Sequence, residues 1–338
     1  MAVKAGSRTI HTQLTKALGI KHPIVQGGMH HVGFAELASA VSNAGGLGLI
    51  TALTQPSPEK LREEIEKCRE MTDKPFGVNF TMIPALKEFD FEGYARAIME
   101  GGVTIIETAG SPQLAEYWQK FKEHDSRSII LHKCVSTRHA QKAERMGCDF
   151  ISLDGFECAG HPGEEDVGNF VLQALGARRL GIPYICSGGV GTGVQLAAAL
   201  ALGAEGVNLG TRFIATKEAP VHENIKQALV DGSETDTTLV MRSVRNTERV
   251  YNNETAQKVL QRERERPGDF SHILDLVRGE NYRKSFHETG NRDDSVWSAG
   301  QVMGLIEDVP SCEHLLQRMV DEAATVIEDR LQPMVKSS

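Results

Sequence analysis

Eight short apolar runs, each ending in or directly followed by a glycine or a polar residue, alternate with amphipathic stretches before Thr216. The runs are residues 22–26, 47–51, 76–80, 103–108, 129–133, 150–154, 184–187 and 207–210. Between them, Ser57 and Pro58 form a favourable helix start, and Gly203 is typical of a helix stop. Strands that alternate with helices predict a parallel sheet, and eight such units in about 215 residues predict a closed (β/α)8 TIM barrel of the α/β class.

Two glycine-containing segments follow the last two predicted strands. They are Ser187-Gly188-Gly189 and Gly210-Thr211. Bare backbone N–H groups at the start of a helix bind phosphate, and TIM barrels place such sites after strands seven and eight. Because these loops come last and no GxGxxG opens the chain, the barrel is favoured over an open doubly wound sheet. The sequence therefore predicts a phosphorylated ligand.

The rhythm of strands and helices changes after Thr216. Residues 219–283 are rich in charge, with helix-like pieces at 221–230 and 254–264. We expect residues 219–304 to form a second, smaller helical domain over the barrel mouth, in which 295–304 returns towards the active site. Residues 1–218 and 305–338 are expected to form the barrel and its C-terminal helix, an amphipathic stretch at 312–331.

Composition excludes several classes of protein. The net charge of −8 argues against broad nucleic-acid binding, which needs a basic face. No run approaches the ~20 apolar residues of a membrane span, and residues 1–15 lack the apolar core of a secretory signal. The six cysteines are scattered, which fits a reducing compartment better than a disulfide scaffold. We expect a cytoplasmic protein with no nucleic-acid or membrane partner.

Polar residues at the predicted strand ends could carry chemistry. Gly27 and Gly28 would let a flat ligand lie against the backbone, although a plain tight turn is the alternative. Burial of the Lys133 ammonium at the end of a strand costs free energy unless the group faces an anion. The alternative is that the side chain extends to the solvent at the barrel mouth. His161 lies between glycine and proline on a loop, where an imidazole can act as a general base or be merely exposed.

Other reactive side chains give weaker signals. Nothing in their spacing selects Cys134 or Cys158 as a nucleophile. Adjacent histidines such as His30 and His31 usually point apart, and no HExxH pattern accompanies them, so we expect no metal site. The basic residues 242, 245 and 249 are expected to form a solvated face rather than a nucleotide-phosphate site.

The chain resembles the nitronate monooxygenase family, formerly called 2-nitropropane dioxygenases, from His22 to about Leu331. The motifs that carry the resemblance are HPIVQGGM, VSNAGGLG, TALTQPSPE, KPFGVNFT, HKCVSTRHAQKAERMG, DGFECAGHPGE, SGGVGTG, LGTRF and WSAGQVMGLI. The resemblance implies a TIM barrel with an added helical domain and a tightly held FMN. It also implies oxidation of alkyl nitronates by O2 to a carbonyl compound and nitrite.

The resemblance also implies roles for individual residues. His161 matches the active-site histidine, proposed as a base for neutral nitroalkanes. The cofactor-binding residues would be Gly27, Gly28, Met29, Asn79, Lys133, Asp154, Ala159, Gly160, Ser187, Gly188, Gly189, Gly210 and Thr211. The first three would lie against the flavin, Asn79 and Lys133 would bind its ring, and the last five would hold its phosphate. The substrate side would include His30, Pro84, Ser298 and Gly300.

The sequence is compatible with more than one function. The blocks TALTQPSPE, HKC, RHAQKAE and FECAGHPGE look most like NADH:quinone reductases within the family, with NADH and a quinone as substrates. Those enzymes tend to have glutamine after GGM and a Pro-Thr-Gln-Lys-Pro segment after strand three, where this chain has His30 and Pro84-Ala85-Leu86-Lys87-Glu88. We therefore favour nitronate oxidation. A barrel lyase or isomerase, a flavin-binding barrel without turnover, and a homodimeric assembly also stay open.

Overall fold

A closed ring of eight parallel strands forms the centre of the protein. The structure, a computed structural model, describes residues 8–82 and 89–335. The strands are β1 (Ile24–Gln26), β2 (Gly48–Thr51), β3 (Phe76–Met82), β4 (Ile105–Gly110), β5 (Ile129–Cys134), β6 (Phe150–Asp154), β7 (Tyr184–Ser187) and β8 (Val207–Leu209). Each pairs in parallel with its sequence neighbour, β8 pairs with β1, and a parallel bridge from Val25 to Leu47 closes the ring. The predicted TIM barrel is confirmed.

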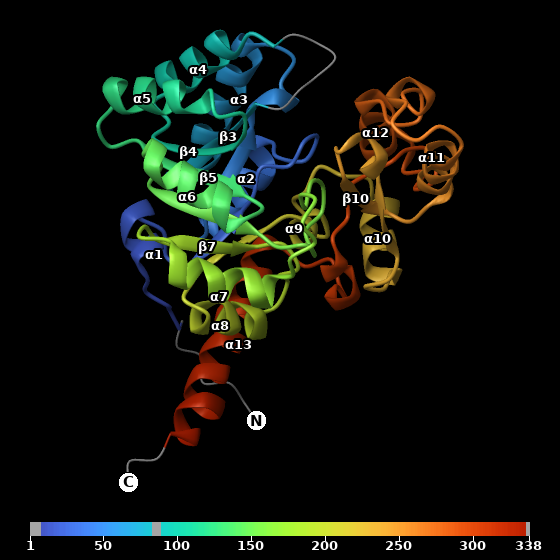
Figure 1. The fold of residues 1–338 in the computed structure, drawn as a ribbon. Helices are drawn as coiled ribbons and strands as arrows, with labels where there is room; N and C mark the ends of the chain where they lie inside the picture. Colours follow the sequence, from blue (N-terminus) through green and yellow to red (C-terminus); the bar gives the residue numbers. More distant parts are fainter. Residues whose placement is uncertain (1–7, 83–88, 336–338) are drawn as a thin grey trace.

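Helices cover the outside of the ring (Figure 1). They are α2 (Ala35–Asn43), α3 (Pro58–Met71), α4 (Phe91–Glu100), α5 (Leu114–His124), α6 (Thr137–Met146), α7 (Asn169–Arg179) and α8 (Gly193–Ala201). Ser57 caps α3, with Pro58 in its first turn, as its sequence predicts. Thr192 and Gln195 form a capping box at the start of α8, directly after the seventh strand's glycine loop.

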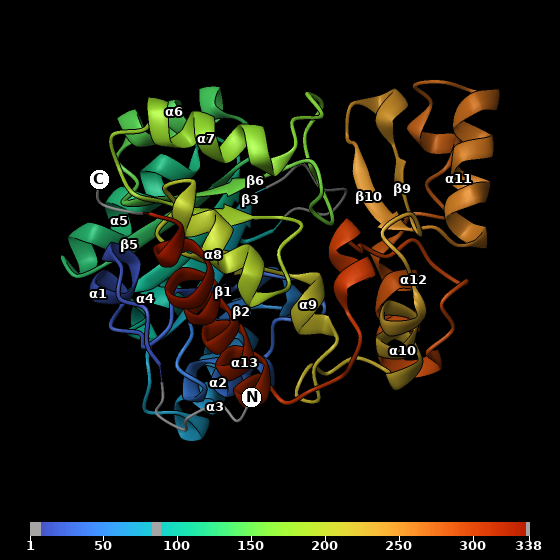
Figure 2. The same cartoon turned by 90° about the horizontal axis from the view of Figure 1, so that it is seen from below.

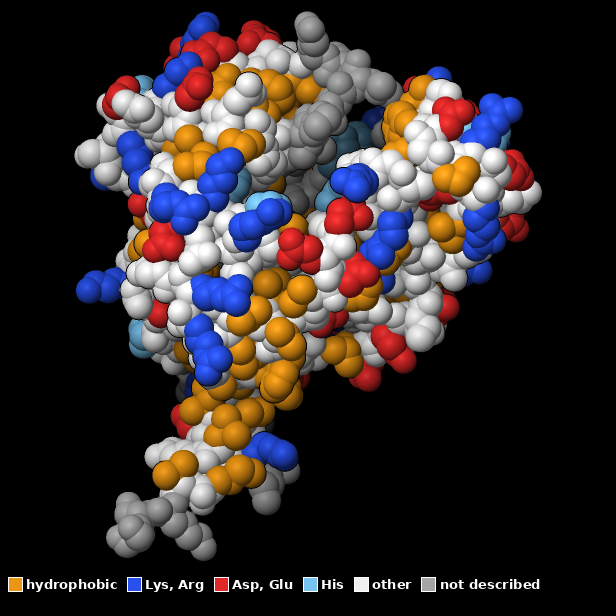
Figure 3. All heavy atoms as spheres, viewed as in Figure 1, with side chains coloured by type: hydrophobic (Ala, Val, Ile, Leu, Met, Phe, Trp, Pro, Cys, Tyr) orange, Lys and Arg blue, Asp and Glu red, His pale blue; other side chains and the backbone are white. Residues whose placement is uncertain are grey.

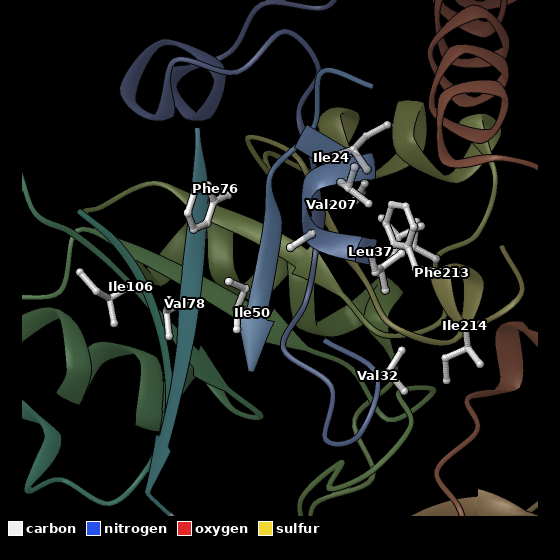
Figure 4. Close-up of a cluster of buried hydrophobic side chains, with 14 of the residues drawn as sticks. Ile24, Val32, Leu37, Ile50, Phe76, Val78, Ile106, Val207, Phe213 and Ile214 are labelled. Atoms are coloured by element: carbon white, nitrogen blue, oxygen red, sulfur yellow. The ribbon is translucent and has the colours of Figure 1, made fainter. Parts of the chain in front are cut away.

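The alternation of side chains along each strand builds two hydrophobic clusters. Inward residues such as Val25, Leu49 and Ile105 join Leu14 of the short helix α1 (Gln13–Leu18) in one cluster. The neighbouring strand residues belong to a larger cluster that includes the surrounding helices, and Figure 4 shows part of it. Successive strand residues face opposite sides of a sheet, so apolar runs cover both faces.

A smaller group of elements lies beside the barrel in both ribbon views (Figures 1 and 2), and we call residues 223–289 the cap. The cap contains α10 (Glu223–Asp231), β9 (Thr237–Val240), β10 (Glu248–Tyr251), α11 (Glu254–Glu265) and α12 (Gly279–Lys284), and it ends in a π-helical turn (Ser285–Thr289). The predicted helical region also contains an antiparallel hairpin, formed by β9 and β10, that was not expected. Val240, Val250 and Val259 pack in a hydrophobic cluster of the cap's own. The domain boundaries at 218/219 and 304/305 stay predictions.

The C-terminal helix returns to the barrel. Helix α13 (Cys312–Thr325) buries Leu316 and Met319 and contacts α2 and α8, then continues as a π-helical segment (Val326–Leu331) that projects from the barrel (Figure 1). Its extent matches the predicted amphipathic stretch. Across residues 8–82 and 89–335, no helix has the length and apolar character needed to cross a membrane.

Candidate active site

Polar groups from several strands meet inside the carboxyl end of the barrel. Glu107 of β4 is fully buried, and its carboxylate accepts hydrogen bonds from the N–H of Gly28 at 2.9 Å, Asn79 Nδ2 at 2.7 Å and Asn208 Nδ2 at 2.8 Å. Asn208 Nδ2 also donates a hydrogen bond to Ser152 Oγ at 3.1 Å. The structure thus joins the predicted residues Gly28 and Asn79 through Glu107, which in turn binds Asn208; neither Glu107 nor Asn208 was predicted to belong to the site. The sequence signal for this network is the presence of a carboxylate, Glu107, and an amide, Asn208, within otherwise apolar strands.

A charged pair lies at the ends of β5 and β6. Lys133 Nζ is 3.6 Å from Asp154 Oδ2, and the lysine side chain is only partly exposed. Burial opposes the charged form of Lys133, but the carboxylates of Asp154 and Glu107 outweigh it and hold the pKa of the lysine above its ordinary value. Burial also raises the pKa of Asp154, against the effect of Lys133 and a hydrogen bond from Ser187. The barrel mouth therefore holds a fixed ammonium group.

The loop after β1 lies tightly against the barrel interior. A Cβ atom on Gly27 would come within 2.3 Å of Asn208 Oδ1, and one on Gly28 within 2.2 Å of Asn79 Cγ. The N–H of Met29 donates to Thr51 Oγ1 at 2.9 Å, and the hydroxyl donates back to the Met29 carbonyl at 3.0 Å. The two glycines are needed here because the loop backbone approaches β3 and β8 too closely for any side chain.

The loop after β7 carries two backbone amides suited to an anion. Gly188 and Gly189 have φ of 82° and 72°, in the left-handed region. Within the described residues, no hydrogen bond uses either N–H group. Their carbonyls accept from Asn169 and, at 2.6 Å, from Gln195 Nε2. Successive free N–H groups in such a turn form an anion-binding nest.

Other predicted cofactor residues border more open space. Among the described residues, a Cβ on Gly160 would lie within 4 Å of Ser298 Oγ alone, at 4.0 Å, and one on Gly210 would meet atoms of Met29 alone, the nearest at 3.6 Å. Thr211 Oγ1 accepts the N–H of Gly300 at 3.0 Å. Gly160 and Gly210 are therefore less tightly packed than Gly27 and Gly28 in the loop after β1.

The loop between β6 and α7 is attached to the cap on both sides of His161. Gly160 and Arg249 exchange backbone hydrogen bonds at 3.1 and 2.6 Å, and Glu164 accepts from the hydroxyl of Thr247 at 2.6 Å. The Arg249 guanidinium lies 4.5 Å from the Phe156 ring centroid and donates to the Phe156 carbonyl at 3.0 Å. The expectation of a solvated face was therefore wrong for Arg249, which is buried.

The side chain of His161 is exposed between these two attachments. It follows Gly160, which lies near Ser298, and half-buried Ala159, whose backbone N would be 3.2 Å from a Cβ on Gly300. The loop is thus held at the rim of the barrel mouth, with the imidazole of His161 accessible to solvent. Its role as a base stays a prediction.

The segment after the cap returns to the same place. Ser298 Oγ donates to Glu248 Oε1 at 2.6 Å, and the N–H of Gln301 donates to the Glu157 carbonyl at 3.1 Å. The structure therefore brings Ser298 and Gly300 next to Gly160 and Thr211. Pro84, the remaining substrate-side residue besides His30, lies outside the described residues.

The two adjacent histidines do not point apart, contrary to expectation. The rings of His30 and His31 have centroids 3.8 Å apart, and His31 adopts a φ of 60°. His31 also lies near Tyr282 and His287 of the cap, with centroid distances of 5.6 and 6.1 Å. Burial and the His30 imidazole lower the pKa of His31 to about 3. Figure 3 shows a hollow between barrel and cap in which histidine side chains are visible.

Burial makes the two candidate cysteine nucleophiles less reactive. Cys134 and Cys158 are buried, and burial raises the pKa of both thiols, which disfavours the nucleophilic thiolate. In the described part of the chain, no three or more His, Cys, Asp or Glu side chains are grouped so that they could hold a metal ion. Lys133, the amide pair of Gly188 and Gly189 and the loop histidine His161 remain the candidate residues at this mouth.

Comparison with known proteins identifies the family to which this chain belongs. The family model described as nitronate monooxygenase matches residues 11–322. A Mycobacterium tuberculosis protein named (3aS,4S,5R,7aS)-5-hydroxy-7a-methyl-1-oxo-octahydro-1H-indene-4-carboxyl-CoA dehydrogenase is 30% identical, over 94% of this chain and 98% of that protein. The nitronate monooxygenase of Pseudomonas aeruginosa is 28% identical, over 92% of this chain and 98% of that protein. FabK from Thermotoga maritima has a similar structure, with a TM-score of 0.88 and 32% identity over 97% of this chain and all of that one. The chain belongs to the nitronate monooxygenase family of oxidoreductases.

Proposed function

We propose that this protein is an FMN-dependent oxidase of alkyl nitronates, which uses O2 and yields a carbonyl compound and nitrite. The family match supports the reaction class. The observation that carries the proposal is the amide pair of Gly188 and Gly189, whose N–H groups find no partner in the described residues. Such a nest at the end of strand seven is suited to the phosphate of a mononucleotide.

The residues present fit FMN. Its phosphate would be held by the amides of Gly188 and Gly189 together with the Gly210-Thr211 segment. Its ring would lie against Gly27, Gly28 and Met29 and bind Asn79 and Lys133, and Asp154, Ser187, Ala159 and Gly160 would complete the site. Gly160 and Gly210 are less tightly packed than Gly27 and Gly28, since a Cβ on either would come no closer than 3.6 Å to another described residue. When bound, the flavin would supply the electron-accepting ring that no side chain provides.

Lys133 gives the site a fixed positive charge. Because Asp154 and Glu107 favour its charged form, the ammonium persists across the neutral pH range. A preorganised cation stabilises negative charge that develops nearby, and it does so without reorganising during the reaction. Asp154, at 3.6 Å, holds the ammonium in place.

His161 would act only on neutral nitroalkanes. Such substrates must lose a proton from the carbon that bears the nitro group, whereas nitronates have already lost it. The exposed imidazole can accept this proton and release it to solvent. Ser298, fixed by its hydrogen bond to Glu248, and His30 would border the substrate from the side of the cap.

A second candidate is dehydrogenation of a coenzyme A thioester. The similarity to the M. tuberculosis CoA dehydrogenase, at 30% identity over nearly the full length of both chains, favours it. The same flavin site would serve either reaction. NADH:quinone reduction stays the alternative that the sequence motifs suggested.

Anaerobic mixing distinguishes these functions. Purified protein is mixed with an alkyl nitronate, with NADH or with an acyl-CoA while flavin absorbance is recorded, and oxygen is then admitted. Nitronate oxidation predicts bleaching by the nitronate and oxygen-dependent formation of nitrite. Bleaching by NADH alone, with rapid reoxidation by a quinone, would support the reductase, and bleaching by the acyl-CoA alone would support the dehydrogenase. A colourless protein that retains no FMN would contradict all three.

A further inference from the structure

The Glu107 carboxylate connects three parts of the barrel mouth. From β4 it accepts hydrogen bonds from the loop after β1 (Gly28), from β3 (Asn79) and from β8 (Asn208), at 2.7–2.9 Å. All three partners are donors, so the position needs a group that only accepts. A glutamine would turn an NH2 group towards at least one of these donors. The three donors therefore match the two acceptor oxygens of a glutamate better than the amide of a glutamine.

The same carboxylate fixes the orientation of the Asn79 carboxamide. Asn79 Nδ2 faces Glu107 because an ionised carboxylate cannot donate, and Asn79 Oδ1 accepts from Thr81 Oγ1 at 3.0 Å. One N–H and one lone pair of the amide remain for a ligand. Glu107 also holds the Gly28 N–H, so it sets the position of the loop on which a flat ring would lie.

Glu107 also places a negative charge beneath the mouth. Two carboxylates, Asp154 and Glu107, influence the single ammonium group of Lys133. Lys133 lies next to Asp154 rather than Glu107, so the Glu107 charge is compensated mainly by neutral hydrogen-bond donors. A buried charge acts on its surroundings with little screening.

We propose that Glu107 is a positioning residue for the flavin ring, which fixes the Gly28 amide and the Asn79 carboxamide, and whose negative charge disfavours reduction of the ring. This inference rests on the proposed FMN site. It assigns to a residue away from the reacting atoms both a share of the FMN affinity and control of the reduction equilibrium.

The test compares Glu107→Gln with Glu64→Gln. Glu64 is a suitable control because its carboxylate also accepts a backbone N–H, that of Ala35 at 2.7 Å, but from the outer helix α3. Apoproteins are titrated with FMN, and the two-electron reduction equilibrium of bound FMN is measured against reference dyes. Glu107→Gln is expected to weaken FMN binding at least about tenfold, the effect of losing one charge-assisted hydrogen bond. It should also shift the reduction equilibrium about tenfold towards reduced flavin, which is about 30 mV.

Glu64→Gln should change neither quantity by more than about twofold. A Glu107→Gln protein that matches Glu64→Gln in both measurements would overturn the inference while leaving the FMN site intact. A wild-type apoprotein that binds no FMN would instead remove the proposed function itself.

Glu107→Asp provides a second test, which is sufficient by itself if Glu107→Gln does not fold. It keeps the charge but withdraws the oxygens from Gly28 and Asn79. FMN binding should weaken at least about tenfold, while the reduction equilibrium stays within about threefold of the wild type. FMN affinity equal to that of the wild type would overturn the positioning role, and a tenfold shift of the equilibrium would overturn the role of the charge.

Discussion

Replacing Gly188 with alanine tests whether the loop after β7 is built as described. Gly188 has a φ of 82°, and an added Cβ would lie 2.6 Å from the Cβ of Cys158. A side chain in the left-handed region costs about 1–2 kcal/mol. Overpacking a tight contact adds about 1–3 kcal/mol. The free energy of unfolding should therefore fall by about 2–5 kcal/mol.

Gly147→Ala is the matched control. Gly147 ends helix α6 with a φ of 95°, but a Cβ there would meet no atom of residues 8–82 and 89–335 within 4 Å. This variant should lose only the conformational part, about 1–2 kcal/mol. Urea unfolding of both apoproteins gives the difference, which isolates the contact with Cys158. FMN titration then shows whether the distortion reaches the proposed phosphate site.

Gly188→Ala should be less stable than Gly147→Ala by about 1–3 kcal/mol and should bind FMN at least about tenfold more weakly. Gly147→Ala should bind FMN like the wild type. Equal stabilities would refute the packing argument. Wild-type FMN affinity in Gly188→Ala would refute the assignment of this loop to the phosphate.

Three further predictions concern charge and protonation. His161→Asn should lower kcat/KM for neutral nitroalkanes by about a hundredfold or more and leave turnover of preformed nitronates nearly unchanged; equal losses in steady-state assays would exclude the base. Lys133→Met should shift the reduction equilibrium of bound FMN at least about tenfold towards the oxidised form, measured against reference dyes, and no shift would contradict the electrostatic role. Burial is the main cause that lowers the pKa of His22 and of His132 to about 4, so between pH 6.5 and 4 the unfolded chain binds protons that the folded protein does not. Stability should therefore fall as the pH falls, by about 2 kcal/mol for each ring at pH 5, and urea unfolding that shows constant stability from pH 7 to 5 would contradict this.

The barrel could be predicted because its pattern is local. Each strand is an apolar run bounded by turn residues, and each helix shows its own start and amphipathic face. The β9–β10 hairpin was missed because its strands are short and charged residues separate them. Burial of Arg249 was missed for another reason, since its partner is the Phe156 carbonyl of a distant loop.

Part of the candidate site could also be predicted from the sequence. Parallel strands in a barrel end on one face, so the glycines, Lys133 and His161 were expected near one mouth. The pairing of Gly28 and Asn79 through Glu107 could not be predicted, because it depends on the register of β3 and β4 around the ring. The close approach of His30 and His31 depends on the positive φ of His31, which the residue types do not specify.

Titration of the wild-type apoprotein with FMN and with riboflavin tests the central claim most directly, because the two ligands differ only in the phosphate. A phosphate held by the Gly188 and Gly189 amides predicts that FMN binds at least about a hundredfold more tightly than riboflavin. Equal affinities, or no binding of either ligand, would contradict the account.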